Sequence, residues 1–405
     1  MFKTFFKNLG PGPLIAAAFI GPGTVTLCTL AGVQFGMALL WTLLIAIVAA
    51  MVLQSMAVKI GMIGRKSLTE VIKEEVRTPV VKRTLLTLIF AAIIIGNTAY
   101  EAGNISGAVL GLESLFGLFR IELKQFTFNL YPLIIGLLAT SLLWSGKYKI
   151  IERSMIGLVL VMSISFLFTA FTTAPNLGEL IKGLFTFKIP NGSLLMIVGL
   201  VGTTIVPYNL FLHAELVKKK WLDASKINFA MRDMLIALGL GGAISLSIII
   251  TAAGVDTLEI NSAADLALGL EPLFGSNAKY FLACGLFAAG ITSTITAPLA
   301  AAYVVCGCFG WKADLKAKHF KLIWFSIILF GVLLSATGLK LILIIQFAQI
   351  TNGILLPVIA ALLLWMVNKS KLLGTYKNNL TQNIIGALIV VLTLFLSIRT
   401  LILVF

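Results

Sequence analysis

Long apolar stretches dominate the chain and are separated by short polar connections. Each stretch is close to the roughly 20 residues that an α-helix needs to cross the hydrocarbon layer of a bilayer. The stretches are continuous and do not alternate apolar with polar positions, so the pattern predicts membrane helices and excludes a β-barrel. We place eleven of them, at residues 12–34, 37–63, 84–112, 128–146, 154–173, 193–217, 229–255, 277–310, 321–338, 339–367 and 380–405.

The connection between the second and third stretches has a pattern of its own. Residues 67–77 read S-L-T-E-V-I-K-E-E-V-R, with Ser67 and Glu70 at capping-box spacing. This spacing predicts a short helix that lies on the surface rather than crossing the membrane.

The composition agrees with a membrane protein. The 405 residues are 59% hydrophobic and 12% charged, whereas a soluble domain has about 45–50% apolar and about 25% charged residues. These values exclude an ordinary soluble enzyme, a disordered protein and a nucleic-acid-binding protein. The formal net charge of +15 does not indicate a nucleic-acid partner, because the cations lie in short clusters between apolar runs. The expected surroundings are a lipid bilayer.

The positions of Lys and Arg predict the orientation of the chain. In membrane proteins these residues collect in the cytoplasmic connections. We count 24 of the 31 Lys and Arg in one alternate set of connections, whereas four acidic residues share one loop of the opposite set, at 256–271. The pattern predicts a cytoplasmic N-terminus and, after eleven spans, an external C-terminus.

The four cysteines all fall within predicted spans, so no disulfide framework is expected. Cys306 and Cys308, separated by one glycine, could suggest a metal site. We favour packing, because cysteine commonly serves as a small buried apolar side chain. The sequence indicates no cofactor.

Two spans carry proline and glycine where an uninterrupted helix would be expected. The first span contains I-G-P-G-T at 20–24, and the sixth contains T-T-I-V-P-Y-N at 203–209. Proline removes a helix donor and clashes with the preceding turn, which frees backbone groups that must line a cavity or meet a ligand. Each break alone is compatible with a simple kink. Together, at matching depths, they favour a substrate site between two broken helices.

The two breaks also divide the chain. Five spans separate the starts of the two broken helices, which predicts a five-plus-five inverted repeat of the LeuT type. We therefore expect an all-α membrane fold with one repeat at 1–175, a second at 176–368 and an additional helix at 369–405.

Several motifs resemble those of the Nramp (natural resistance-associated macrophage protein) family. Residues 10–61, including A-G-V-Q-F-G-M-A-L-L-W, follow the first two helices of that family. The stretch G-T-T-I-V-P-Y-N-L-F-L-H-A in span six resembles the segment around the family's Met-Pro-His-Asn break. Span eight, with I-T-S-T-I-T, and span ten, with A-Q-I-T-N-G-I-L-L-P, are also similar. The resemblance covers most of residues 10–365 and implies a transporter in a bacterial plasma membrane.

The resemblance implies a proton-coupled importer of divalent transition metals such as manganese and iron. In that family an Asp and an Asn of the first break, a Met of the second break and nearby carbonyls hold the ion. Here Gly21 takes the place of the Asp and Thr24 that of the Asn. Val206 replaces the Met, and Tyr208 replaces the His of the second break. Every metal-binding side chain of the two breaks is therefore replaced.

The ligands that remain at the corresponding positions are neutral oxygens. The family's carbonyl donors correspond to Ala18 and Thr203, its span-ten glutamine corresponds to Gln349, and Asn209 is kept. Moving a divalent cation out of water costs on the order of tens of kcal/mol per unit charge by Born estimates. Carboxylates, imidazoles or thiolates usually offset that cost, so we assign no metal ligand with a charged side chain.

Two classes of substrate fit this set. The family's function favours a divalent cation, which could reach neutral oxygens through its own water shell as magnesium does. The alternative is a small anionic or neutral polar solute, such as an amino acid or an organic acid. Unwinding at 21–24 exposes backbone N–H groups at the positive end of a half-helix, and no aspartate there repels an anion.

Three further polar residues are candidates for proton coupling. Glu101 lies near the middle of span three, where the family has an acidic residue of its proton route, and Asn104 takes the place of a second acid. His213 matches a family histidine linked to proton passage. The alternatives are a structural carboxyl at Glu101 and an interfacial histidine beside Glu215 and Lys218. The S-T-I-T run at 293–296 and Gln349 have either a substrate role or a role in helix contact.

These observations favour an alternating-access carrier of a small solute or ion, for which a monomer is sufficient. A membrane enzyme is disfavoured, because the chain has two histidines, no nucleophile beside a recognisable base and no appended catalytic domain. A channel is compatible with the composition, but two broken helices suit a carrier better.

Overall fold

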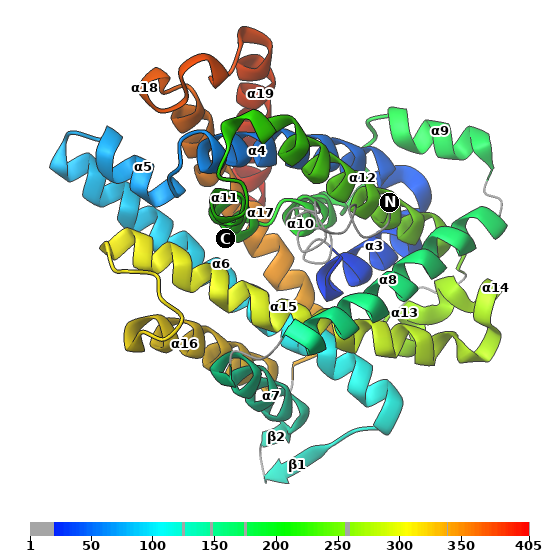
Figure 1. Ribbon diagram of the computed structural model, residues 1–405. Coiled ribbons are helices and arrows are strands. Elements are labelled where there is room, and N and C mark those ends of the chain that lie inside the picture. Colours follow the sequence, from blue (N-terminus) through cyan, green and yellow to red (C-terminus); the bar gives the residue numbers. More distant parts are fainter. Residues whose placement is uncertain are drawn as a thin grey trace, which may run out of the picture.

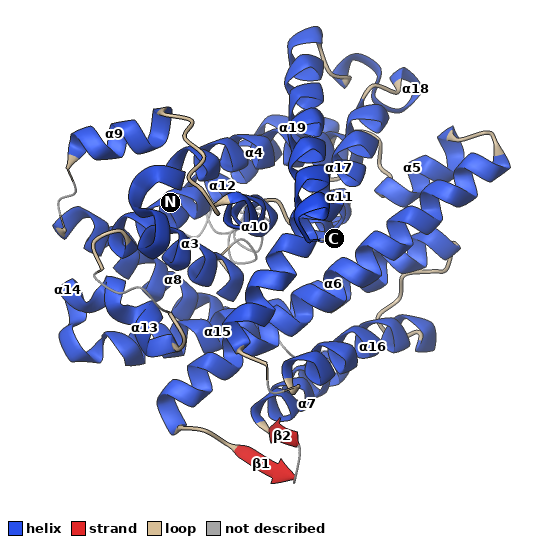
Figure 2. Cartoon of the chain, turned by 180° about the vertical axis from the view of Figure 1, so that it is seen from behind, coloured by secondary structure: helices blue, strands red, loops and turns tan. Residues whose placement is uncertain are grey.

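The computed structural model describes residues 20–123, 126–145, 149–173, 176–255, 260–337 and 339–404. Nearly all of this part of the chain is helical (Figures 1 and 2). The longer helices are α3 (Pro22–Phe35), α4 (Leu40–Met62), α6 (Pro79–Phe116), α7 (Tyr131–Ser145), α8 (Lys149–Thr172), α10 (Leu194–Thr204), α11 (Pro207–Lys220), α12 (Ile227–Ala252), α15 (Ala278–Phe309), α16 (Lys318–Ser335), α17 (Leu341–Val367) and α19 (Leu380–Val404).

Shorter elements connect these helices. One two-stranded antiparallel hairpin, which the hydrophobic pattern did not predict, follows α6 and pairs Arg120 with Asn129. The remaining short elements are α5 (Leu68–Glu75), α9 (Leu177–Phe185), α13 (Ala263–Ala267), α14 (Glu271–Phe274), α18 (Ser370–Leu373), the strands β1 (Arg120–Leu123) and β2 (Phe126–Asn129), and the 3₁₀ turns η1 (Gly36–Leu39), η2 (Ala224–Lys226), η3 (Leu268–Leu270), η4 (Gly275–Asn277) and η5 (Gly374–Tyr376).

The apolar helices coincide with the predicted spans. Within the described residues, eight helical segments are long and apolar enough to cross a membrane. One of them, Pro22–Met62, contains both α3 and α4, which Gly36 separates with a positive φ of 56°. The segments Tyr131–Ser145 and Ile156–Thr172 are shorter apolar helices. Each of the eleven predicted stretches therefore contains an apolar helix, the first being described only from residue 20.

The surface helix predicted between the second and third spans is present as α5. The Ser67 hydroxyl accepts a hydrogen bond from the Glu70 amide, and the Glu70 carboxylate accepts one from the Ser67 amide at 2.6 Å. The helix ends at Glu75, two residues earlier than predicted, because Val76 is extended and Pro79 begins the next helix. All four cysteines are free thiols, as expected.

The second break is an interruption of the helix rather than a kink. Helix α10 ends at Thr204 and α11 begins at Pro207, with Val206 in an extended conformation. At the first break α3 begins at Pro22, and Gly21 before it is extended with φ −95° and ψ 177°. Proline at the first position of each helix has no N–H to lose from the hydrogen-bond ladder. The half of the first broken helix that precedes residue 20 lies outside the described residues.

Glycines allow the helices around the breaks to approach closely. Gly107 of α6 lies against the ring of Pro22, and Gly290 of α15 lies against Ala108 of α6. A Cβ at Gly202 of α10 would lie 2.7 Å from the backbone nitrogen of Gly353 in α17. Small residues at such contacts let membrane helices pack backbone to backbone. In Figure 1, α6 and α15 accordingly run side by side through the molecule, next to α3 and α17.

Candidate substrate site between the two broken helices

The two breaks meet through a pair of threonine hydroxyls. The Oγ1 of Thr24, in the first turn of α3, lies 2.9 Å from the Oγ1 of Thr203, at the end of α10. Both side chains are buried. The sequence predicted both residues for the site, and the structure brings them into a hydrogen bond.

Gln349 brings a third helix to the same place. A Cβ on Gly23 would lie 2.6 Å from the Cδ of Gln349, so only glycine leaves room for this side chain. The backbone of Gln349 lies against Gly202 of α10. The glutamine of α17 therefore lies against both α3 and α10.

Gly21 faces two hydroxyls from other helices. A Cβ built on Gly21 would lie 3.5 Å from the Oγ of Ser293 in α15 and 3.5 Å from the hydroxyl of Tyr100 in α6. The ring of Tyr100 makes an edge-to-face contact with Tyr208 of α11, at 5.3 Å between centroids. Tyr100 therefore lies beside the first break, and Tyr208, the second residue of α11, lies beside the second. Tyr100 was not predicted from the sequence, because one aromatic residue in an apolar helix usually indicates packing.

Several buried polar atoms near the breaks have no hydrogen-bond partner within the described part of the chain. Such atoms are costly to bury unless water or a ligand satisfies them. The described part of the chain includes no group of three His, Cys, Asp or Glu side chains that could hold a metal ion. The unpartnered atoms of α11, α15 and α17 include Asn209 Oδ1, Ser293 Oγ, Thr294 Oγ1, Gln349 Oε1 and Asn352 Nδ2.

Besides Gly21, two of the predicted positions supply no polar side chain. Val206 is buried and precedes the first turn of α11. Its carbonyl accepts a hydrogen bond from the backbone N–H of Asn209 at 3.0 Å. Ala18, predicted as a carbonyl donor, lies outside the described residues.

The helices that leave the two breaks begin without charge compensation. Neither α3 nor α11 has a side-chain N-cap, and neither has an acidic residue in its first turn. Free N–H groups and the helix dipole give each of these ends a partial positive charge. The ends can therefore favour a negatively charged group or a lone-pair donor.

Glu101 is fully buried, and its neighbours differ from those of Tyr100. Its Oε2 accepts a hydrogen bond from the Asn104 amide at 3.4 Å, and its Oε1 has no partner among the described residues. Gly331 of α16 lies against its side chain, since a Cβ there would be 2.6 Å from the Cγ of Glu101. The structure thus joins Glu101 to Asn104 and α16, whereas the adjacent Tyr100 faces Gly21.

His213 is buried in the bundle and contacts another helix. Its side chain is 1% exposed, and Nδ1 lies 2.6 Å from the Oε1 of Gln54 in α4. An amide oxygen can only accept a hydrogen bond, so Nδ1 is the donor in this arrangement. Glu215 pairs instead with Lys218 and Lys219. Gln54 was not predicted from the sequence.

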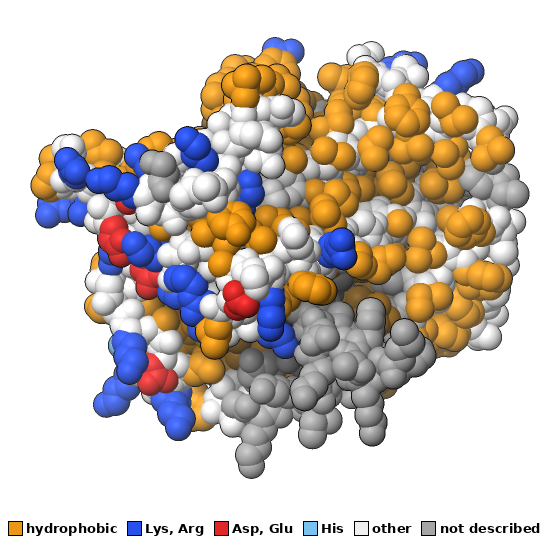
Figure 3. All heavy atoms as spheres, turned by 45° about the horizontal axis from the view of Figure 1, so that its top comes forward, with side chains coloured by type: hydrophobic (Ala, Val, Ile, Leu, Met, Phe, Trp, Pro, Cys, Tyr) orange, Lys and Arg blue, Asp and Glu red, His pale blue; other side chains and the backbone are white. Residues whose placement is uncertain are grey.

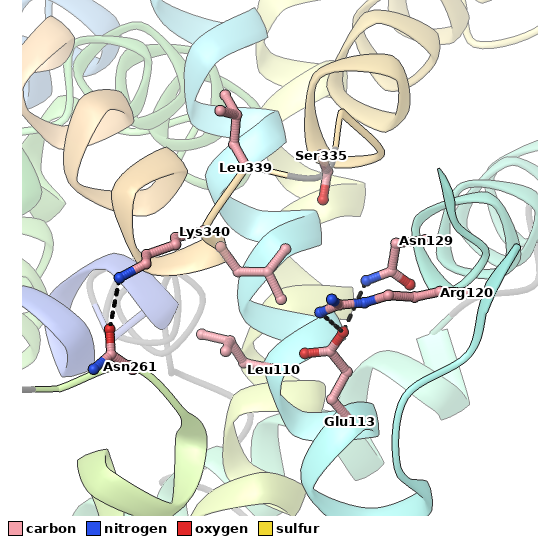
Figure 4. A pocket seen from close by; sticks show the side chains of 9 residues that line it. Leu110, Glu113, Arg120, Asn129, Asn261, Ser335, Leu339 and Lys340 are labelled. Atoms are coloured by element: carbon pink, nitrogen blue, oxygen red, sulfur yellow. Dashed lines mark hydrogen bonds and ion pairs between the residues drawn. The ribbon is translucent and has the colours of Figure 1, made fainter. Parts of the chain in front are cut away.

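Two cavities lie beyond the Glu113 end of α6 and share Asn261 and Lys340. They have volumes of about 280 and 380 Å³. In the first, shown in Figure 4, Arg120 donates to the carboxylate of Glu113 at 3.3 Å, and Lys340 donates to the Oδ1 of Asn261 at 3.2 Å. Ser335 of the same cavity hydrogen-bonds Ser106 of α6 at 3.0 Å.

Comparisons with known proteins identify the family of the chain. Residues 12–403 match the family described as natural resistance-associated macrophage protein-like (Nramp). The divalent metal cation transporter MntH of Staphylococcus saprophyticus is 28% identical, with 98% of this chain and 92% of that protein aligned. The protein of the same name from Bacillus subtilis is 26% identical, with 98% of this chain and 93% of that protein aligned.

Solved structures share the fold. A manganese transporter of Eremococcus coleocola, crystallised with an aromatic bis-isothiourea compound, superposes with a TM-score of 0.76 at 21% identity. That match covers 98% of this chain and 87% of the other. Mhp1, a nucleobase-cation-symport-1 family transporter, superposes in its closed conformation with a TM-score of 0.55 at 16% identity, covering 97% and 92% of the two chains. The chain therefore belongs to the Nramp family, and it is an integral, multi-pass membrane transporter with a LeuT-like fold rather than an enzyme.

Proposed function

We propose that this protein is an alternating-access carrier whose substrate binds between the two broken helices. The observation that carries the proposal is the hydrogen bond between Thr24 and Thr203, which joins the breaks deep in the bundle. Around it lie neutral polar atoms of α11, α15 and α17 that have no partner within the described residues. A substrate would supply the partners that these atoms lack.

The proposed substrate is a divalent metal cation, the class named for the curated relatives. Hydroxyl, amide and carbonyl oxygens are ligands of hard cations, and Mg²⁺ keeps several waters when it binds to proteins. Val206 supplies no sulfur, so the site lacks the soft ligand that would favour manganese or iron. We therefore propose a hard, partly hydrated cation such as Mg²⁺ as the preferred metal.

A small anionic or neutral polar solute is the second candidate. Its support is the pair of helix ends at Pro22 and Pro207, which have neither a side-chain cap nor an acid in the first turn. A substrate carboxylate would bind to N–H groups at such an end. Gly21 leaves space for it beside Ser293 and Tyr100.

For proton coupling we propose Glu101, with its neighbour Asn104, and His213. Glu101 is a carboxyl without an ion pair in the described part of the bundle, and intramembrane carboxyls of this kind commonly carry protons. His213 is held by Gln54 in one orientation. A proton could therefore bind at either group without breaking an ion pair.

We also propose an orientation in the membrane and a division into repeats. The N-terminus is cytoplasmic, the C-terminus is external, and the membrane is a bacterial plasma membrane. Spans one to five (1–175) and six to ten (176–368) form the two repeats, and 369–405 adds a helix. A single chain supplies all the residues proposed for the site, so a monomer is sufficient.

Uptake into vesicles reconstituted with the purified protein tests the proposal. We expect saturable uptake of Mg²⁺ that exceeds uptake of Mn²⁺. Asn209→Ala should reduce it strongly, whereas Asn368→Ala, which removes an exposed amide bonded to Asn383, should not. Saturable uptake of an amino acid or organic acid, with no metal flux, would favour the second candidate. Equal uptake by both variants would contradict the placement of the site.

A further inference from the structure

A groove separate from the proposed substrate site lies between the start of α6 and the end of α15. Its volume is about 430 Å³. It lies at the end of the bundle where Lys and Arg gather, and Figure 3 shows these charges beside a broad hydrophobic surface. Its lining residues are Pro79, Lys82, Arg83, Leu86, Thr87, Phe90, Cys308 and Phe309.

The cations of this groove, Lys82 and Arg83, form no ion pairs with the described residues. Other cations at this end of the bundle are paired, including Lys66 with Glu74 and Lys218 with Glu70. The groove therefore presents two positive charges to whatever occupies it.

A third cation lies close by. The Nζ of Lys73, on α5, would be 2.9 Å from a Cβ at Gly310, two residues after the lining residue Cys308. No ion pair of Lys73 is found in the described part of the chain. The positive potential at the groove is thus reinforced from a second element.

The groove changes from charged to apolar along the helix axis. Lys82, Leu86 and Phe90 follow one another at a spacing of four residues, so they share one face of α6. Eight residues of helix span about 12 Å. At the deeper end Phe90 packs edge to face on Phe309, at 5.6 Å between centroids, and Phe309 is 55% exposed.

We propose that this groove binds an anionic phospholipid of the surrounding bilayer. The phosphate lies between Lys82 and Arg83, and an acyl chain runs along Leu86, Phe90 and Phe309. Basic pockets between membrane helices at the cytoplasmic side bind anionic headgroups in this way. A free phosphate would leave the aromatic wall unused, and a zwitterionic lipid would leave the paired cations without a net counter-charge. The proposal is independent of the identity of the transported solute.

Lipid binding to the full-length protein in detergent tests the proposal. We would titrate short-chain phosphatidylglycerol and phosphatidylcholine and follow bound lipid by native mass spectrometry and by thermal shift. Phosphatidylglycerol should bind more tightly. Each cation near a lipid headgroup contributes about 5-fold in affinity, so the double variant Lys82→Gln/Arg83→Gln should lose roughly 30-fold.

Two further variants make the result specific. Lys316→Gln/Lys318→Gln removes two cations from the same end of the molecule but outside the groove, and should leave lipid affinity unchanged. Thr87→Trp keeps both groove cations and fills the exposed wall, and should weaken binding of the lipid at least several-fold.

Three outcomes would overturn the proposal. Equal binding of the two lipids would remove the role of charge, and equal losses in the two double variants would indicate general attraction to a basic surface. Inorganic phosphate or glycerol phosphate that binds as tightly as phosphatidylglycerol would identify a site for a free anion. The last comparison separates the lipid from a soluble source of the same phosphate chemistry.

Discussion

Thr24 and Thr203 share a hydrogen bond of 2.9 Å although 179 positions separate them in the sequence. One belongs to the first broken helix and the other to the second. Both groups are neutral hydroxyls, and either can donate. The direction of this hydrogen bond can therefore be reversed when a ligand binds to one of the oxygens. A neutral bond thus stands at the point where the family resemblance implies an ion held by charged and soft ligands.

Replacing Thr203 by valine tests this link. Valine keeps the shape of the side chain but removes the oxygen, and the loss of one such bond costs about 0.5–1.5 kcal/mol. We expect the apparent affinity for the transported substrate to fall by about 5-fold, measured as the half-saturating concentration for uptake.

The matched control is Thr393→Val in α19. That threonine is equally buried, but its hydroxyl bonds to Ile389 of its own helix. Its replacement should leave the apparent affinity unchanged. A similar loss in both variants would mean that the effect is one of general stability.

Restoring the metal ligands of the family is the second prediction. The triple variant Gly21→Asp, Thr24→Asn, Val206→Met should bind Mn²⁺ measurably more tightly than the natural sequence, as followed by calorimetry. A carboxylate offsets the lost hydration of the ion. The extended backbone of Gly21 admits a side chain, and a Cβ there makes only ordinary contacts with Ser293 and Tyr100.

The variant with Thr24→Asn and Val206→Met alone is the control, because it lacks the charge. If both variants bind Mn²⁺ equally, or neither binds it, position 21 does not face the substrate.

The third prediction concerns coupling. Glu101→Gln retains an oxygen that can accept from Asn104 but cannot carry a proton. We expect substrate-driven acidification of the vesicle interior to be abolished, as measured with a trapped pH dye.

Glu113→Gln, on the same helix, removes a carboxylate that pairs with Arg120 and should preserve the ratio of protons to substrate. Unchanged acidification in Glu101→Gln would assign Glu101 a structural role, which would then show as reduced thermal stability alone.

The fourth prediction is a pH effect at α5. Burial alone would raise the pKa of Glu70, but the hydrogen bond and charge of Lys218, together with the Ser67 hydrogen bonds, lower it below the ordinary 4.5. A lowered folded pKa stabilises the folded form above the unfolded value, and that stability is lost as the pH falls through the folded pKa. Because the Glu70 side chain is 47% exposed, the ion pair contributes only about 0–1 kcal/mol.

Hydrogen exchange of the α5 amides measures this effect. Exchange should accelerate as the pH falls below 4.5, after correction for intrinsic rates. Glu70→Gln preserves the capping box and should remove the acid dependence. Glu74→Gln, which loses only the pair with Lys66, should retain it, and an unaltered pH profile in Glu70→Gln would contradict the role of the pair.

The sequence predicted the spans and both breaks because their signals are local. Twenty apolar residues, or a proline beside a glycine, specify the backbone without reference to any other part of the chain. The same holds for the capping box of Ser67 and Glu70, which the structure confirms.

The partners within the site could not be predicted in the same way. Tyr100 reaches Gly21, and Gln54 reaches His213, only because helices distant in the sequence pack at particular rotations. The side chains of neighbouring residues in a helix point about 100° apart, so Tyr100 and Glu101 contact different helices. The sequence of an apolar helix does not show which of its faces packs against which neighbouring helix.

Gly107 of α6 lies against the ring of Pro22, where any larger side chain would collide with it. The point at which α3 starts is thus held in place by α6. If the carrier rocks one set of helices past another, we expect this contact to make α3 and α6 move together at that point. Ile205 and Val206, which join two separate helices, then offer a place for hinge motion.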